Sequence, residues 1–166
     1  FQIEGPPPPA APAVITQDDE GRSTIPAFRV DGMNTDGVLE EPFYQTTASI
    51  DAFIQSTPNA GAEPSERTEA WISFDDENVY ISARIWYSLP EDEWVANELR
   101  RDNANNRTQD QFGVFLDTFY DRRNAIGIYV NPLGGFSDLQ ITNEGNPNFD
   151  WNPVTEVRTG RFEGGW

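Results

Sequence analysis

Two tryptophans and an arginine occupy alternating positions in the middle of the chain. Trp71 lies between apolar positions of one alternating strand pattern, and Arg84 and Trp86 lie between or beside apolar positions of the next. Because side chains alternate between the two faces of a strand, these three residues are predicted to share the outer face of a hairpin. Aromatic rings stack on the apolar face of a pyranose, and a guanidinium donates hydrogen bonds to its hydroxyls. The face suits a carbohydrate, unless a loop or second sheet covers it and the tryptophans are packing residues.

Two further residues are candidates for the same chemistry. Asp117 follows another alternating pattern and is a hydrogen-bond acceptor for sugar hydroxyls, whereas Trp151 lies in a polar segment where it could equally anchor a loop. Trp94 is a secondary candidate. Paired carboxylates such as Asp117 and Asp121 can also hydrolyse glycosidic bonds. Aspartates are so abundant in this chain that a chance pair is expected, and we therefore predict no catalysis.

A short acidic turn separates the first two strand patterns. It contains Asp75, Asp76 and Glu77, which are three adjacent donors of the hard oxygen type that calcium prefers. Calcium takes six to eight oxygens, so this run cannot form a site unaided. These three residues are the candidate metal ligands, and a solvated hairpin turn is the alternative.

The composition excludes several classes of function. Twenty-eight acidic residues oppose eleven basic ones, all of them arginine, and the formal net charge is −17. Such a field repels nucleic acid and anionic lipid headgroups. Histidine and cysteine are absent, which removes the usual acid–base and nucleophilic groups and the common zinc ligands. No stretch approaches the ~20 apolar residues of a spanning helix, so we expect no direct membrane insertion by this segment.

The chain divides into a leader and one domain. Residues 1–24 are rich in proline and then in acidic and polar residues, which predicts an extended leader without a core of its own. Residues 25–166 are predicted to form a single β domain with a short helix or turn within residues 89–103. Its expected strands are residues 27–32, 70–74, 79–85, 112–119, 126–130, 138–142 and 154–161.

Several phrases of this domain resemble a known family. They are ERTEAWISFDDENVYISARIWYS at residues 66–88, RRDN at 100–103, DTFYDRRN at 117–124, VNPLGG at 130–135 and NFDWNPV at 148–154. Together they resemble the sugar-binding-like domain of large bacterial surface proteins, which is similar to carbohydrate-binding module family 9. In those proteins the domain follows a secretion signal and precedes a region expected to form an outer-membrane β-barrel. The segment at residues 30–44 departs from the family phrase, with extra turn residues and Tyr44 in place of a tryptophan.

The resemblance implies an all-β, antiparallel, jelly-roll-like sandwich that is incomplete at its carboxyl-terminal end. Family members continue with a further strand pair, so either the rest of the polypeptide or a neighbouring chain is expected to complete the fold. The implied function is noncatalytic binding of an oligo- or polysaccharide by an exported protein at the bacterial surface, with calcium as a family-associated ion. The alternative is a structural or assembly domain, which packs on an outer-membrane barrel or in an extracellular polymer through an open sheet edge.

Overall fold

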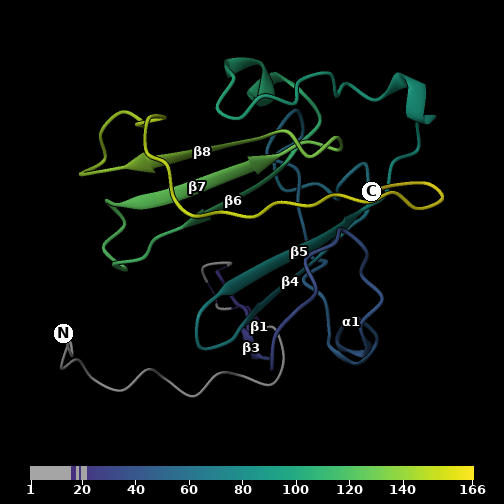
Figure 1. Cartoon of the computed structure of the whole chain (residues 1–166), viewed down its shortest axis with the longest axis horizontal. Helices are drawn as coiled ribbons and strands as arrows, with labels where there is room; N and C mark the ends of the chain where they lie inside the picture. Colours follow the sequence, from purple (N-terminus) through teal and green to yellow (C-terminus); the bar gives the residue numbers. More distant parts are fainter. Residues whose placement is uncertain (1–15, 18, 20–21) are drawn as a thin grey trace. The chain divides into compact units, whose positions relative to one another are not determined.

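The computed structural model describes residues 16–17, 19 and 22–166 (Figure 1). Strands dominate it, which confirms the β-rich class. Two very short strands, β1 (Thr16–Gln17) and β2 (Ser23–Thr24), pair antiparallel. The other strands form two three-stranded sheets, in the orders β3-β4-β5 and β6-β7-β8. The leader predicted for residues 1–24 lies largely outside the described residues.

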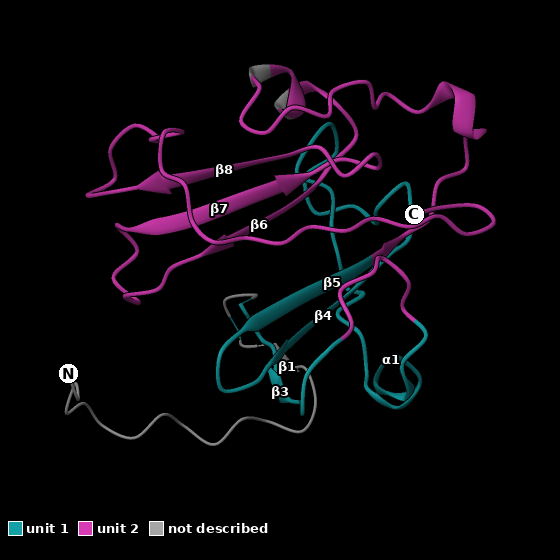
Figure 2. Cartoon of the chain, in the orientation of Figure 1, with its two compact units in different colours: residues 1–33, 40–83 teal, residues 34–39, 84–166 magenta. Residues whose placement is uncertain are grey.

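The chain forms two compact units, which are coloured separately in Figure 2. The first contains residues 40–83 and the described residues before 34, and the second contains residues 34–39 and 84–166. The boundary falls within strand β5, whose last two residues belong to the second unit.

In the first unit, strand β4 (Thr68–Phe74) lies between β3 (Phe28–Arg29) and β5 (Val79–Ile85). The predicted pairing of β4 with β5 across the turn at residues 75–78 is confirmed. Strand β3 runs parallel to β4, so the prediction of purely antiparallel pairing is wrong there. A parallel pair needs a long crossover, and residues 30–67 provide it. This crossover includes helix α1 (Pro42–Thr46), which begins at a proline that cannot supply a backbone donor.

Burial along β4 and β5 differs from the alternation that the sequence predicted, because Ala70 is buried as expected but the opposite face of β4 is buried too. Trp71 and Ser73 are 3% and 1% exposed, whereas Val79, expected on the buried face, is 64% exposed. The Trp71 ring meets that of Tyr44 in α1 edge to face at 5.2 Å, and its indole N–H donates to the carbonyl of Thr47 at 3.2 Å. Helix α1 and the residue after it therefore cover this face, and Trp71 is a packing residue.

In the second unit, β6 (Phe112–Leu116), β7 (Ala125–Val130) and β8 (Phe136–Ile141) form an antiparallel meander. Leu116 faces Ile126 across the first pair, and Ile126 faces Gln140 across the second. The predicted hairpin and the strand after it are thus confirmed, although β6 ends before the predicted residue 119. The buried residues of β8 are unusual because Ser137 and Asp138 accompany Leu139.

The remaining segments of the second unit have little regular structure. Two 3₁₀ turns, η1 (Glu91–Glu93) and η2 (Ala104–Thr108), occur before β6. Residues 154–161, predicted as a strand, alternate between exposed and half-buried side chains but have no strand partner among the described residues. None of the helices in the described part of the chain has the length and hydrophobicity needed to cross a membrane.

We expect Trp71→Ala to lower the free energy of unfolding by about 3–5 kcal/mol, because it removes a large buried ring and leaves a cavity. Val79→Ala at the exposed start of β5 is the control, and it should change this free energy by less than about 1 kcal/mol. Urea denaturation followed by fluorescence and circular dichroism measures both. Equal effects of the two substitutions would contradict the packing of Trp71.

Candidate functional site

Arg84 and Trp86 lie together at the carboxyl-terminal end of β5. Both side chains are half-buried, and the guanidinium carbon of Arg84 lies 6.0 Å from the centre of the Trp86 ring. A guanidinium Nη2 of Arg84 also donates to the carbonyl of Leu39 at 3.1 Å. The alternating pattern of β5 predicted that these two residues share a face, and the structure brings them into contact range.

A tight turn at the end of the described chain packs against this strand end. Phe162 and Gly165 exchange two backbone hydrogen bonds of 3.1 Å, and Ile85 and Trp166 exchange two of 2.8 and 2.9 Å. A Cβ at Gly165 would lie 2.1 Å from the carbonyl oxygen of Ile85, so this close approach requires glycine. The turn places the Phe162 ring edge to face with that of Trp86, at 5.4 Å between centroids.

A second aromatic pair follows directly in the sequence. The rings of Tyr87 and Trp94 meet edge to face at 5.5 Å, and the guanidinium carbon of Arg161 lies 5.3 Å from the centre of the Trp94 ring. Arg161 also forms an ion pair with Glu91 of η1. We call the following set the aromatic–arginine cluster: Arg84, Trp86, Tyr87, Trp94, Arg161 and Phe162. It comprises two side-chain groups, Arg84 with Trp86 and Phe162, and Tyr87 with Trp94 and Arg161, which are linked along the chain at Trp86–Tyr87 and Arg161–Phe162.

The other predicted carbohydrate-binding residues do not join this cluster. Trp71 is a buried residue of the first unit. The Asp117 carboxylate caps its own turn by accepting hydrogen bonds from the backbone N–H groups of Phe119 at 3.2 Å and Arg122 at 2.6 Å. Trp151 is half-buried. Among the described residues, no recorded hydrogen bond or ring contact joins Asp117 or Trp151 to the cluster.

The acidic turn at Asp75, Asp76 and Glu77 uses its carboxylates locally. Asp75 accepts hydrogen bonds from the backbone N–H groups of Glu77 and Asn78 and, at 2.6 Å, from the Tyr80 hydroxyl. The Tyr80 hydrogen bond, followed by that from Glu77, lowers the pKa of Asp75 to about 2. Asp76 is paired with Arg29.

This turn alone cannot complete a calcium site, because calcium takes six to eight oxygens. Asp75 already accepts hydrogen bonds through both carboxylate oxygens within the turn. No group of three or more acidic, histidine or cysteine side chains suited to a metal ion occurs in the part of the chain that the structure describes.

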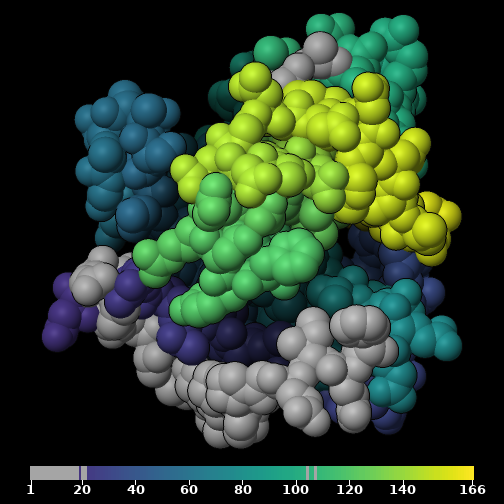
Figure 3. All heavy atoms as spheres, turned by 90° about the vertical axis from the view of Figure 1, so that its left-hand side faces the viewer, coloured from purple at the N-terminus to yellow at the C-terminus, as the bar shows by residue number. Residues whose placement is uncertain are grey.

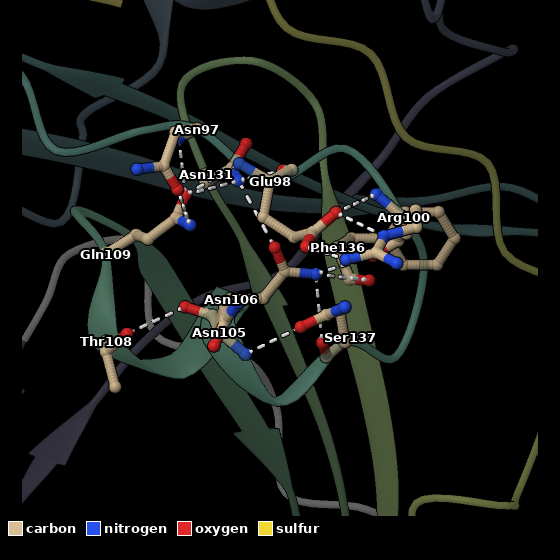
Figure 4. Close-up of polar contacts among 11 residues, drawn as sticks. Asn97, Glu98, Arg100, Asn105, Asn106, Thr108, Gln109, Asn131, Phe136 and Ser137 are labelled. Atoms are coloured by element: carbon tan, nitrogen blue, oxygen red, sulfur yellow. Dashed lines mark hydrogen bonds and ion pairs between the residues drawn. The ribbon is translucent and has the colours of Figure 1, made fainter.

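Buried amides form the best-connected polar network in the second unit (Figure 4). Asn131, which follows β7, is 1% exposed and uses both ends of its amide. Its Nδ2 donates to the carbonyl of Glu98 at 2.6 Å and to Oε1 of Gln109 at 3.1 Å, and its Oδ1 accepts from the N–H groups of Leu133 and Gly135. One side chain thus fixes the turn after β7 and connects it to the segment before η2.

The same network holds residues 97–109 against β8. Asn106, also 1% exposed, donates from Nδ2 to the carbonyls of Arg100 and Phe136 and to Oγ of Ser137, at 3.0 to 3.2 Å. Oε1 of Gln109 accepts from the backbone N–H of Asn97 at 2.9 Å (Figure 4). Buried backbone groups without a strand partner must be satisfied in some other way, and here amide side chains do so.

Two ion pairs accompany this network. Glu98 is bound through both carboxylate oxygens to Arg100, whose hydrogen bonds lower the pKa of Glu98 to about 2. Asp138, which is fully buried, accepts two hydrogen bonds from Arg101 through Oδ2, at 3.0 and 2.7 Å. Burial raises the pKa of Asp138 despite this arginine. Arg101 also lies over the Phe136 ring and donates to the carbonyl of Pro153, so the pair connects three segments.

Sequence reasoning missed several of these residues. Tyr87, Arg161 and Phe162 were not predicted as part of the site, although the paired glycines after Phe162 were a turn signal that could have indicated a return to β5. The amides of Asn106, Gln109 and Asn131 gave no such signal, because polar side chains in irregular segments are usually exposed.

Comparisons with protein-family models, with curated proteins and with solved structures found no match to this chain.

We expect Asn131→Asp to lower the free energy of unfolding by about 3 kcal/mol or more at neutral pH. The substitution keeps the shape but turns a buried donor into a charged acceptor that faces the oxygens of Glu98 and Gln109. Asn105→Asp on the exposed side of η2 is the matched control and should cost less than about 1 kcal/mol. Urea denaturation at pH 7 measures both, and a stable Asn131→Asp variant would contradict the network.

The Glu98–Arg100 pair should contribute to acid sensitivity. A carboxyl whose pKa is lowered on folding stabilises the protein above its unfolded pKa, and this contribution is lost as the pH falls through the folded value. For Glu98 the loss should occur as the pH falls from about 4.5 to about 2. Glu98→Gln should therefore reduce the dependence of the unfolding free energy on pH in this window. Urea denaturation at several pH values between 6 and 2.5 measures it, and an unchanged pH dependence would refute the assignment.

Proposed function

We propose that this chain is a noncatalytic carbohydrate-binding domain of an exported protein at the bacterial cell surface. The observation that carries the proposal is the aromatic–arginine cluster, in which Trp86 and Trp94 each lie close to a guanidinium. Such rings supply the flat apolar surface on which a pyranose stacks. The guanidinium donors and the Glu91 carboxylate supply partners for its hydroxyls. The resemblance to carbohydrate-binding module family 9, with its jelly-roll-like sandwich, supports the same ligand class.

The carboxylates support binding rather than hydrolysis. Asp117 and Asp121 accept backbone hydrogen bonds within their own turn, and the bonds from Arg123 and Asn124 lower the pKa of Asp121. A glycosidase needs one carboxyl with a raised pKa at the scissile bond. Asp138 has a raised pKa but is fully buried and bound to Arg101, so it cannot reach a substrate.

We expect the domain to bind a soluble oligosaccharide and Trp86→Ala or Trp94→Ala to weaken that binding at least tenfold, because each removes a stacking surface. Tyr120→Ala is the control, since Tyr120 is a highly exposed aromatic outside the cluster. Isothermal titration against a panel of neutral and acidic oligosaccharides measures the affinities, with and without calcium. Circular dichroism confirms that each variant is folded.

Three outcomes would count against this assignment. One is the absence of binding to every sugar of the panel, and another is binding that the cluster variants leave unchanged. The third is an equal loss of affinity in Tyr120→Ala. A calcium requirement would add the family-associated ion to the proposal.

The alternative is a structural or assembly domain, and one observation favours it. Residues 151–161 are extended, with alternating side-chain exposure, and no backbone hydrogen bond joins them to another strand among the described residues. Such a segment can accept a strand from a neighbouring chain or from the rest of the polypeptide. A concentration-dependent dimer in light scattering, together with no sugar binding, would favour this alternative.

A further inference from the structure

A hollow of about 410 Å³ lies at one end of the second sheet. Its walls come from the turn between β6 and β7, from the start of β7, and from the end of β8 with the residues that follow it. We call it the turn hollow. Figure 3 shows the molecule from the side on which this end of the sheet lies, with the turn in green and the segment after β8 in yellow-green. Its lining includes no residue of the aromatic–arginine cluster.

The lining combines one exposed ring with several neutral polar groups. Phe119 is 75% exposed, and Ile126 and Ile141 add apolar surface to the lining. The polar lining residues are Thr118, Asp121, Asn124, Gln140, Thr142 and Asn143. Amides and hydroxyls both donate and accept hydrogen bonds, so they match the hydroxyls of a sugar. The lining contains one acidic and no basic side chain, which favours a neutral ligand over an anion.

Hydrogen bonds hold the walls of the hollow in place. Asp121 accepts from the backbone N–H groups of Arg123 and Asn124, at 2.8 and 2.9 Å. Oδ1 of Asn124 then accepts from the backbone N–H of Asn143 at 3.1 Å, and the backbone N–H of Glu144 donates to the carbonyl of Arg123 at 2.8 Å. These bonds tie the β6–β7 turn to the segment after β8. Together with the bond from Nδ2 of Asn124 to Asp121, they fix the Asn124 amide and the backbone of both segments before a ligand arrives.

The same two segments contain an unusual concentration of strained backbone. Tyr120, Arg122, Asn143 and Glu144 all have φ between 53° and 58°, and only one other non-glycine residue in the described chain has a positive φ. This left-handed conformation is unfavourable for residues with a Cβ. At Asn143 and Glu144 the positive φ belongs to the tight turn that the hydrogen bond from the Gly145 N–H to the Thr142 carbonyl closes. Glycine would relieve the strain, yet none of the four positions is glycine.

We propose that the turn hollow binds a single neutral pyranose, with the ring stacked on Phe119 and its hydroxyls bound by Asn124, Gln140 and Asn143. This second sugar site goes beyond the function proposed above, and it does not require that the aromatic–arginine cluster bind sugar. A depression of this volume suits one small ligand rather than a long polymer. The exposed ring at its rim provides the stacking surface.

The test is titration of the 166-residue chain with glucose, galactose, mannose, xylose and glucuronate, followed by chemical shifts of the backbone amides. A neutral sugar should shift the signals of residues 118–126 and 140–143, whether or not it also shifts those of residues 84–94 at the cluster. Phe119→Ala and Phe119→Leu should each weaken this binding at least tenfold, whereas Phe119→Tyr should stay within threefold of the parent. Tyr120→Ala, at the adjacent exposed ring outside the hollow, is the matched control and should stay within twofold.

Each contrary result has a distinct meaning. The proposal is overturned if no neutral sugar shifts these signals, if Tyr120→Ala weakens binding as much as Phe119→Ala, or if glucuronate binds as tightly as the best neutral sugar. Trp86→Ala separates the two sites, because it should leave binding in the turn hollow unchanged. If sugars shift the signals of the hollow but none of those of the cluster, only the proposed function is refuted. If sugars shift the signals of the cluster but none of those of the hollow, only this inference is refuted.

Discussion

The second unit depends on the satisfaction of buried backbone groups by buried amides. Residues 97–109 follow Trp94 without joining a sheet, so their carbonyl and N–H groups need other partners wherever the segment is buried. Asn131, Asn106 and Gln109 provide these partners from the turn after β7 and from η2. A buried network of this kind is stabilising only when nearly all of its members are satisfied. The amides are therefore as necessary to this unit as apolar side chains are to an ordinary core.

This constraint extends to the candidate sugar-binding cluster. Directly after Trp94, the backbone N–H of Val95 donates to the Asp110 carboxylate at 2.8 Å, and the N–H of Asp110 donates to the carbonyl of Val95 at 2.9 Å. The cluster tryptophan is thus anchored on its carboxyl-terminal side by the segment that the amides hold. At the other end, the glycine turn at residues 164–165 fixes Phe162 against Trp86. The ring positions follow from backbone restraints on both sides, which is the preorganisation that a binding surface needs.

Alternation in the sequence predicted where strands occur better than which faces they bury. The patterns that became β5, β6 and β7 had clear period-two signals, and their turns contained Asp and Asn. The prediction for Trp71 failed because alternation says only that two faces differ. The ring that packs against Trp71 belongs to Tyr44, which is more than twenty residues away in sequence. Residues 154–161 have the alternation of a strand but lack a strand partner among the described residues. A local pattern cannot predict this, because strand pairing also needs a second strand with which to form backbone hydrogen bonds.

The charge of the chain limits which ligands either site can favour. Its arginines are largely committed to nearby carboxylates, as in the pairs of Arg101 with Asp138, Arg100 with Glu98 and Arg161 with Glu91. With a net charge of −17, no large positive field remains to attract an anionic polymer. Stacking and hydrogen bonding to uncharged hydroxyls do not depend on such a field. A neutral saccharide, the ligand proposed for the cluster and for the turn hollow, is compatible with exposed aromatic rings on an acidic chain.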